Sequence, residues 1–221
     1  MKFLIFDAGP LISLSLNGML YVIENLKKEF DGDFIITPEV KKEVVDRPLN
    51  TKKYELGGLR IKELLDKGIL KASQSRVRND LLEKETDLVL NIANSSLKAE
   101  RNISLIQRGE ASCLAFARLC NCESAIVIDE RTTRMLSENP EGLCKIMESK
   151  LHVKITLNKQ KIKDLKQFKF IRSTELLYIA YKKDLLNIKK DKKLLDAILY
   201  AAKYSGAAIS QKEIEEIVRL A

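Results

Sequence analysis

Short runs of apolar residues interrupt a chain that otherwise carries its apolar residues at helical spacing. The clearest runs cover residues 3–6 (FLIF), 34–36 (FII) and 125–128 (AIVI), and a weaker candidate, VKIT, covers residues 153–156. Runs that are apolar at nearly every position are typical of parallel strands that helices cover on both faces. We therefore expect buried strands of a parallel sheet at these positions.

Segments with helical patterns separate these runs. Residues 11–30 repeat apolar side chains at helical spacing, with Gly18 as an interruption, and residues 109–120 form a second, compact pattern. The segment 37–46 opens with Thr37 and Pro38, a combination typical of a helix N-terminus. The alternation predicts an α/β fold with a doubly wound central parallel sheet flanked by helices. The site of such a fold lies beyond the carboxyl ends of its strands.

Two segments fall outside this alternation. Residues 73–108 are polar with spaced apolar positions, which predicts a helical insertion of one or two long helices. The chain beyond about residue 170 predicts a tail of further helices; Gly206 ends one, and Ser210 with Glu213 forms a capping box at the start of the last. We expect a domain over residues 1–160 that includes the insertion, and a helical C-terminal extension over residues 161–221 packed on it.

The net charge of the chain indicates the kind of partner that it binds. The 221 residues include 39 basic and 31 acidic side chains, a formal net charge of +8. A surplus of this size fits a polyanion such as nucleic acid, although lysine-rich surfaces also serve solubility. No apolar run reaches the roughly 18 residues of a membrane helix, and MKFLIF meets Asp7 before a signal-peptide core can form. We expect a cytoplasmic protein without a membrane partner.

Several classes of site lack the residues they need. The cysteines, Cys113, Cys120, Cys122 and Cys144, do not have zinc-site spacing, and a buried helix face explains the first two. His152 is the single histidine, which excludes Ser-His-Asp and Cys-His catalysis. The phosphate-binding pattern GxxxxGK[ST] is absent from the sequence.

Carboxylates follow two of the expected strands. Asp7 comes directly after the first run, and Asp129, followed by Glu130, comes directly after AIVI. The carboxyl ends of parallel strands meet at one edge of a sheet, so we expect both aspartates there. Glu43, one turn into the helix after the second strand, is a better candidate for the same edge than Glu39, which the helix dipole explains. Glu110 begins the helix that precedes AIVI.

Carboxylates gathered at one edge need a compensating charge. Oxygen ligands suit Mg²⁺ or Mn²⁺, which activate water and stabilise phosphodiester transition states. Each acid also has an ordinary alternative: Asp7 as a helix N-cap, Glu110 as a first-turn acid, Glu43 as a solvated charge and Asp129 as a turn residue. Their common predicted edge favours the functional interpretation.

In this order, FLIFDAGPLISL, ITPEVKKEV, GEASCLAFARL and AIVIDERTTR resemble the motifs of PIN-domain ribonucleases. The tail, with LLDAILYAAKYSGAAIS, is similar to the end of a larger prokaryotic group of that family, which is related to toxins of toxin–antitoxin pairs. The resemblance gives the acidic metal-binding positions to Asp7, Glu43, Glu110 and Asp129. It places Glu130 where the family often has a second Asp and matches Arg134 to the family's arginine.

The first motif departs from the family pattern. DAGP has Ala8 and Gly9 where the family usually supplies a hydroxyl group, and Ser13 lies further along the chain as a possible phosphate-binding or supporting hydroxyl. Glu130 in place of Asp lengthens one candidate ligand by a methylene group.

The resemblance implies a metal-dependent endoribonuclease that cleaves RNA. Its relation to toxins extends this expectation to a toxin role with a small antitoxin-like partner, and we expect a homodimer. The alternative is a PIN-like scaffold that binds nucleic acid or protein without cleavage, which the DAGP departure supports. A phosphatase with Asp7 as nucleophile is the least favoured hypothesis, because Gly9 stands where that chemistry needs a second acid.

Overall fold

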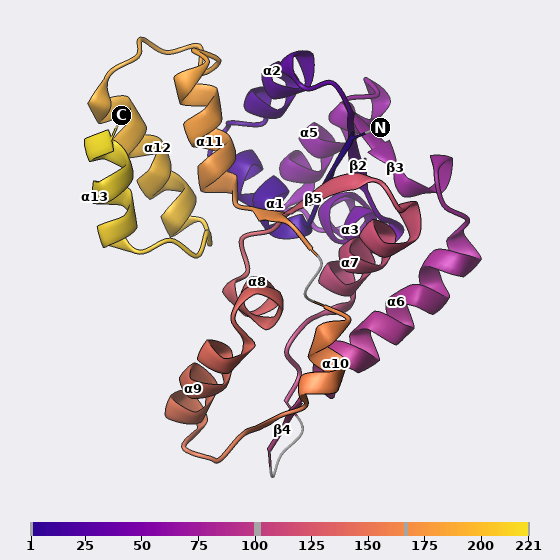
Figure 1. The fold of residues 1–221 in the computed structure, drawn as a ribbon. Coiled ribbons are helices and arrows are strands. Elements are labelled where there is room, and N and C mark those ends of the chain that lie inside the picture. The colour runs from indigo at the N-terminus through magenta and orange to yellow at the C-terminus, as the bar shows by residue number, and fades with distance from the viewer. Residues whose placement is uncertain (1, 100–102, 166–167, 221) are drawn as a thin grey trace.

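The central feature of the computed structural model, which describes residues 2–99, 103–165 and 168–220, is a five-stranded sheet in the order β3-β2-β1-β5-β7 (Figure 1). Every neighbouring pair in this sheet is parallel. Helices flank the sheet, so the α/β class and the parallel sheet are confirmed. The strands are β1 (Lys2–Phe6), β2 (Asp33–Ile36), β3 (Leu70–Ala72), β5 (Glu123–Val127) and β7 (Phe170–Ile171).

The three clearest apolar runs are confirmed as β2, β1 and β5, the middle strands of the sheet. The prediction for residues 153–156 was wrong in position and partner. The strand there is β6 (Thr156–Leu157), which pairs antiparallel with β4 (Leu97–Lys98) in a separate two-stranded sheet. VKIT alternates polar and apolar residues, and an alternating pattern does not suit a strand covered on both faces.

The strand order reverses between β1 and β5. From β1 the chain adds β2 and β3 on one side, whereas β5 and β7 lie on the other. The register pairs Phe6 with Val127, and the Asp7 amide donates to the Val127 carbonyl at 3.0 Å. Crevices at such reversals, beyond the carboxyl ends of the strands, are where open α/β sheets bind ligands.

The sequence contains signals for where the first helices begin and end. The pattern over residues 11–30 divides into two helices at Gly18, whose φ of +67° suits glycine. Thr37 is confirmed as an N-cap because its side chain accepts from the Val40 amide. The elements of this half are α1 (Ala8–Leu16), α2 (Tyr21–Glu29), α3 (Pro38–Lys41), the π-helical η1 (Lys42–Asp46), α4 (Arg47–Leu49), α5 (Glu55–Asp66) and the 3₁₀ turn η2 (Ser73–Ser75).

The insertion contains one long helix, α6 (Asn79–Asn94), which packs against α7 (Arg108–Cys120). Part of the expected insertion, residues 100–102, lies outside the described residues. The remaining helices are α8 (Arg131–Glu138), α9 (Pro140–Leu151), α10 (Lys159–Lys163), α11 (Ser173–Lys182), α12 (Lys192–Tyr204) and α13 (Gln211–Leu220). None of the helices in the described part of the chain is both long and apolar enough to span a membrane.

The C-terminal helices are joined to the sheet domain. β7 lies beyond the boundary expected at residue 160 and contributes an edge strand to the central sheet. The Asn17 side-chain amide donates to the Ser205 hydroxyl at 2.8 Å and to the Ala201 carbonyl at 3.3 Å, which ties the end of α1 to the end of α12. The predicted capping box is confirmed, with the Ser210 amide donating to Glu213 at 2.8 Å.

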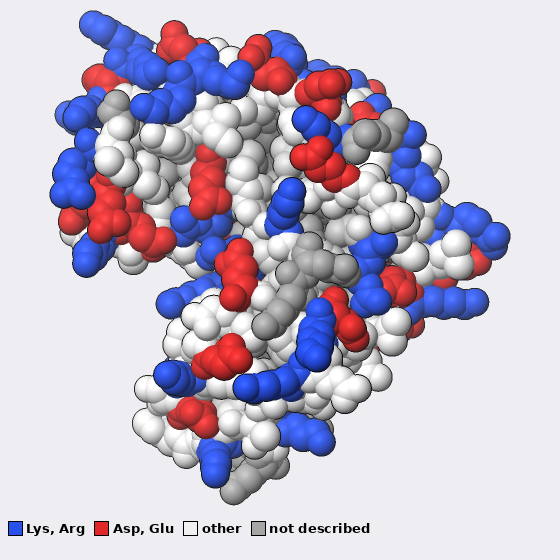
Figure 2. All heavy atoms as spheres, viewed as in Figure 1, with Lys and Arg blue, Asp and Glu red and all other residues white. Residues whose placement is uncertain are grey.

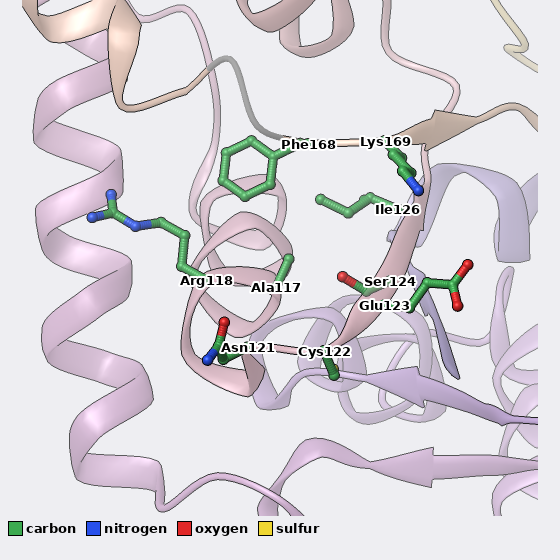
Figure 3. A pocket seen from close by; sticks show the side chains of 9 residues that line it. All are labelled: Ala117, Arg118, Asn121, Cys122, Glu123, Ser124, Ile126, Phe168 and Lys169. Carbon is green, nitrogen blue, oxygen red and sulfur yellow. The ribbon is translucent and has the colours of Figure 1, made fainter. Parts of the chain in front are cut away.

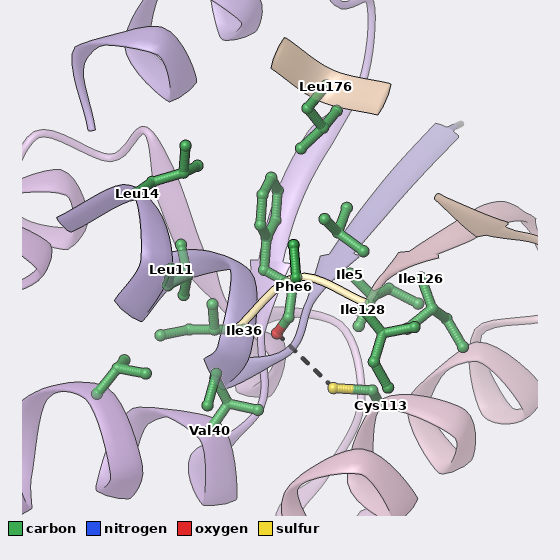
Figure 4. Close-up of a cluster of buried hydrophobic side chains, with 14 of the residues drawn as sticks. Ile5, Phe6, Leu11, Leu14, Ile36, Val40, Cys113, Ile126, Ile128 and Leu176 are labelled. Carbon is green, nitrogen blue, oxygen red and sulfur yellow. Dashed lines mark hydrogen bonds between the residues drawn. The ribbon is translucent and has the colours of Figure 1, made fainter. Parts of the chain in front are cut away.

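The core lies between the middle strands and the helices that cover them. Figure 4 shows side chains of β1, α1, α3 and α7 packed together, with the Cys113 thiol donating to the Phe6 carbonyl at 3.7 Å. Ile5 and Phe6 are fully buried, as is Cys113, in agreement with the structural interpretation of that cysteine. This packing holds the carboxyl ends of β1 and β5 in place.

Substitution Ile5→Ala should lower the free energy of unfolding by about 2–5 kcal/mol, because Ile5 is fully buried in the middle strand. Ile188→Ala, at a side chain that is 58% exposed, is the matched control and should change it by less than about 0.5 kcal/mol. Urea unfolding followed by circular dichroism measures both, and equal losses would contradict the position of β1 in the core.

Candidate active site

A pocket of about 530 Å³ opens at the carboxyl edge of the sheet, and we call it the acidic pocket. The structure brings every acid predicted for this edge to its lining, although the acids come from four separate stretches of chain. Those acids are Asp7, Glu43, Glu110, Asp129 and Glu130.

Asp7 is both a helix cap and a wall of the acidic pocket. It follows β1, is 7% exposed, and accepts from the Gly9 amide at 3.4 Å at the start of α1. A Cβ on Gly9 would lie 3.7 Å from Asp7 Oδ2 and 3.9 Å from Asp129 Cβ, so this turn passes close to both aspartates. Burial, followed by the negative charge of Glu110, raises the pKa of Asp7 to about 7.

Glu110 is held by two hydrogen bonds. Its Oε2 accepts from the Gln107 amide at 2.6 Å, as part of a capping box at the start of α7, and its Oε1 accepts from the Thr133 hydroxyl at 2.8 Å. Burial raises the pKa of Glu110 above its ordinary value, although both hydrogen bonds oppose the shift.

Glu43 reaches the acidic pocket from η1, the π-helical segment after β2. Burial raises its pKa, and the nearby positive charge of Arg47 acts in the opposite direction. Its Oε1 lies 2.9 Å from the point where a Cβ on Gly109 would stand. The absence of a side chain at Gly109 therefore makes room for the Glu43 carboxylate beside α7.

Asp129 anchors the start of α11. Its two carboxylate oxygens accept from the Ser173 amide at 2.8 Å and from the Ser173 hydroxyl at 2.7 Å. Burial raises the pKa of Asp129, while these bonds and the charge of Arg134 oppose the shift. Because both oxygens already accept hydrogen bonds, Asp129 is less free to move than Asp7 or Glu43.

The remaining predicted site residues lie at the rim of the acidic pocket or outside its lining. Glu130 is exposed at the rim and accepts from the Thr132 amide at 3.0 Å as the cap of α8. Ser13 is buried in α1, its hydroxyl has no partner among the described residues, and it does not line the acidic pocket. Arg134 is partly buried on α8 and also lies outside that lining.

The sequence analysis missed the groups that orient the acids, namely the Gln107 backbone amide, the Thr133 hydroxyl and Ser173. The capping pattern of Gln107 with Glu110, at N-cap and N3, is a local signal that the sequence contains. Ser173 and Thr133 bond to acids that are 44 and 23 residues away along the chain, and spacing gives no signal for such pairs.

The donor set of the acidic pocket fits a hard divalent cation. The described residues that line it include several carboxylates and no lysine or arginine, so nothing in that lining neutralises the acids. Carboxylate oxygens are the ligands that Mg²⁺ and Mn²⁺ prefer. Within the described ranges, however, no three acids, histidines or cysteines stand close enough to form a ready-made metal group. Binding an ion would therefore require side-chain rotation, for which Glu43 at the pocket wall is the best placed.

A pocket at the opposite edge of the sheet has a different character (Figure 3). It measures about 370 Å³ and lies between the end of α7, the start of β5 and the segment Phe168–Lys169. Glu123 is the single acid among the described residues that line it, beside Arg118 and Lys169. The concentration of acids is therefore a property of the carboxyl edge.

In the absence of divalent metal, Asp7 should contribute a loss of stability as the pH rises from 3.8, the ordinary pKa of an Asp, to the raised value of about 7 for Asp7. Within this window the unfolded chain releases the Asp7 proton while the folded chain retains it, so rising pH favours unfolding. Outside the window both states bind the same number of protons at this group. Asp7→Asn should remove this component and keep the helix cap.

Urea unfolding in EDTA across this pH range measures the effect, and the difference between wild type and Asp7→Asn isolates Asp7. The slope of that difference should not exceed about 1.4 kcal/mol per pH unit, the value for one proton. Asp31→Asn, at an exposed acid before β2, is the control and should keep the wild-type profile. Identical profiles for wild type and Asp7→Asn would contradict the burial of an acidic cluster.

Comparison of the chain with protein-family models, with curated proteins and with solved structures finds no match in any of the three. The geometry of the acidic pocket and the motif order therefore carry the functional argument.

Proposed function

We propose that the protein is a metal-dependent endoribonuclease of the PIN type, which hydrolyses RNA phosphodiester bonds at the acidic pocket. The observation that carries the proposal is the convergence of Asp7, Glu43 and Glu110 on one pocket where the strand order reverses. The order of the sequence motifs supports the same family.

Asp7, Glu43, Glu110 and Asp129 would hold Mg²⁺ or Mn²⁺, with Glu130 at the rim as an additional ligand. When bound, such a cation lowers the pKa of water and stabilises charge on a phosphodiester transition state. The chain itself orients the ligands: Thr133 and the Gln107 amide fix Glu110. Ile12, Leu105 and Ile106 contribute apolar side chains to the wall of the acidic pocket.

The positive surface supports an RNA substrate. Figure 2 shows basic side chains spread over one face, with a dense group at the upper left, where Figure 1 places the α11–α12 connection. Exposed lysines in this connection and its flanks would attract the phosphate backbone. They are Lys182, Lys183, Lys189, Lys190, Lys192 and Lys193.

A second candidate function is a PIN-like scaffold that binds RNA without cleaving it. Two observations favour it: the described acids form no ready-made metal group, and Ala8 and Gly9 supply no hydroxyl beside Asp7. This function predicts RNA binding that does not respond to divalent metal. A role as a toxin with an antitoxin-like partner rests on the resemblance alone.

Cleavage of a mixed RNA panel should require Mn²⁺ or Mg²⁺, stop in EDTA, and fall by about 100-fold or more in Asp7→Asn, because even groups that orient metal ligands are worth about 10–100-fold. Gel analysis of labelled RNA measures the rates. Asp31→Asn, on the other edge of the sheet, should cleave like wild type. RNA binding without metal-dependent cleavage would instead support the scaffold function.

Gly109→Ala should impair cleavage without unfolding the protein. The added Cβ would lie 2.9 Å from Glu43 Oε1, so the flexible carboxylate must move away from its place beside α7. Alanine is also a better helix former than glycine by up to about 1 kcal/mol, so thermal stability should not fall. Wild-type cleavage by this variant would show that the position of Glu43 beside α7 does not matter, whereas loss of folding would contradict the local geometry.

A further inference from the structure

A second hollow, of about 550 Å³, adjoins the acidic pocket, and we call it the apolar hollow. Ile12 and Glu43 line both, so the two hollows share a wall. Exposed apolar side chains of α1 and of the start of α5 form much of its surface: Leu16 is 67% exposed, Leu56 is 61% exposed and Tyr54 is 50% exposed. Exposed apolar surface gathered in one hollow indicates a binding surface.

Two glycines of α5 allow the walls of the apolar hollow to pack closely. A Cβ on Gly57 would lie 3.2 Å from Ser15 Oγ on α1, and one on Gly58 would lie 2.9 Å from Pro48 Cβ on α4. The missing side chains let α5 pack directly on α1 and α4. Tyr54, at the N-cap of α5, is thereby placed in the lining of the apolar hollow.

Three basic residues and one acid, Glu43, line the apolar hollow, so positive charge is in excess there. Arg47, Lys53 and Arg60 line it, and none of the three forms an ion pair with any acid of the described residues. Neighbouring cations differ: Lys52 pairs with Glu55 at 2.9 Å, and Lys41 pairs with Asp46 at 3.5 Å. Unpaired cations beside an apolar surface suit a ligand that is flat and apolar on one part and anionic on another.

We propose that the apolar hollow binds an unpaired nucleotide of the RNA strand, next to the phosphate in the acidic pocket. This inference rests on the proposed function. The base would stack on Tyr54, where Lys53 now stands 5.2 Å from the ring centroid, and Arg47 and Arg60 would hold the flanking phosphates.

The shared wall explains why the occupant would be part of the substrate. A nucleotide that neighbours the scissile phosphate has to lie directly beside the acidic pocket, and the apolar hollow does so through Glu43 and Ile12. The base has to be unstacked to enter, so the protein should prefer single-stranded RNA to duplex RNA. The three unpaired cations favour RNA over a protein segment, whose apolar face would leave them uncompensated.

The test is binding of a short, unstructured, fluorescently labelled RNA in EDTA, measured by anisotropy, with a perfectly paired duplex as the competing form. Tyr54→Ala should weaken single-strand binding by about 10-fold, the scale of one base stacked on an aromatic ring, and Tyr54→Phe should preserve it. The double variant Arg47→Ala/Arg60→Ala should have a shallower slope of log affinity against log salt concentration, by about 0.7 for each lost phosphate contact. Lys52→Ala, at a paired cation outside the hollow, is the charge control.

The outcomes separate this inference from the proposed function. RNA binding that depends on Tyr54 without any metal-dependent cleavage would refute the nuclease and support the nucleotide site. The nucleotide site would be overturned if Tyr54→Ala cleaved and bound RNA as wild type does. It would also be overturned if wild type did not bind RNA. A change of molecular mass by light scattering in Tyr54→Ala, with RNA binding intact, would assign the hollow to a second copy of the chain and also overturn it.

Discussion

The parallel pairing of β1 with β5 sets the geometry on which the candidate site depends. Because Phe6 is in register with Val127, the chain leaves the two strands at the same edge, and Asp7 and Asp129 follow there. The strand order reverses at this pair, so helices leave the edge in different directions and a crevice opens between them. The acidic pocket occupies that crevice, and Glu43 reaches it from the helical segment after β2.

The acids at this edge have structural and chemical roles at once. Asp7 caps α1, Glu110 completes the capping box of α7, and Asp129 anchors α11 through Ser173. Burial nevertheless raises the pKa of each, because carboxylates are desolvated and the lining contains no basic residue among those described. A structural role such as helix capping is therefore compatible with a role in a functional site, since a capping acid can also face a pocket.

The middle of the sheet and its acidic edge were predictable from the sequence, whereas the edge strands and supporting contacts were not. Apolar runs mark β1, β2 and β5, and an aspartate directly follows the runs of β1 and β5. The edge strands β3 and β7 have three and two residues, too few for a pattern, and β7 follows a long helical excursion. Ser13 is buried in α1 and does not line the acidic pocket, because its distance along the chain from Asp7 does not determine which face of α1 it occupies.

The most direct test of the central claim is the position of a bound divalent cation. Crystals soaked in Mn²⁺, with diffraction recorded at a wavelength where manganese scatters anomalously, would locate it without any assumption about the substrate. The account predicts an anomalous peak within the acidic pocket, in contact with Asp7 and at least one of Glu43 and Glu110. A fully occupied peak elsewhere, or none in the pocket at saturating Mn²⁺, would contradict it.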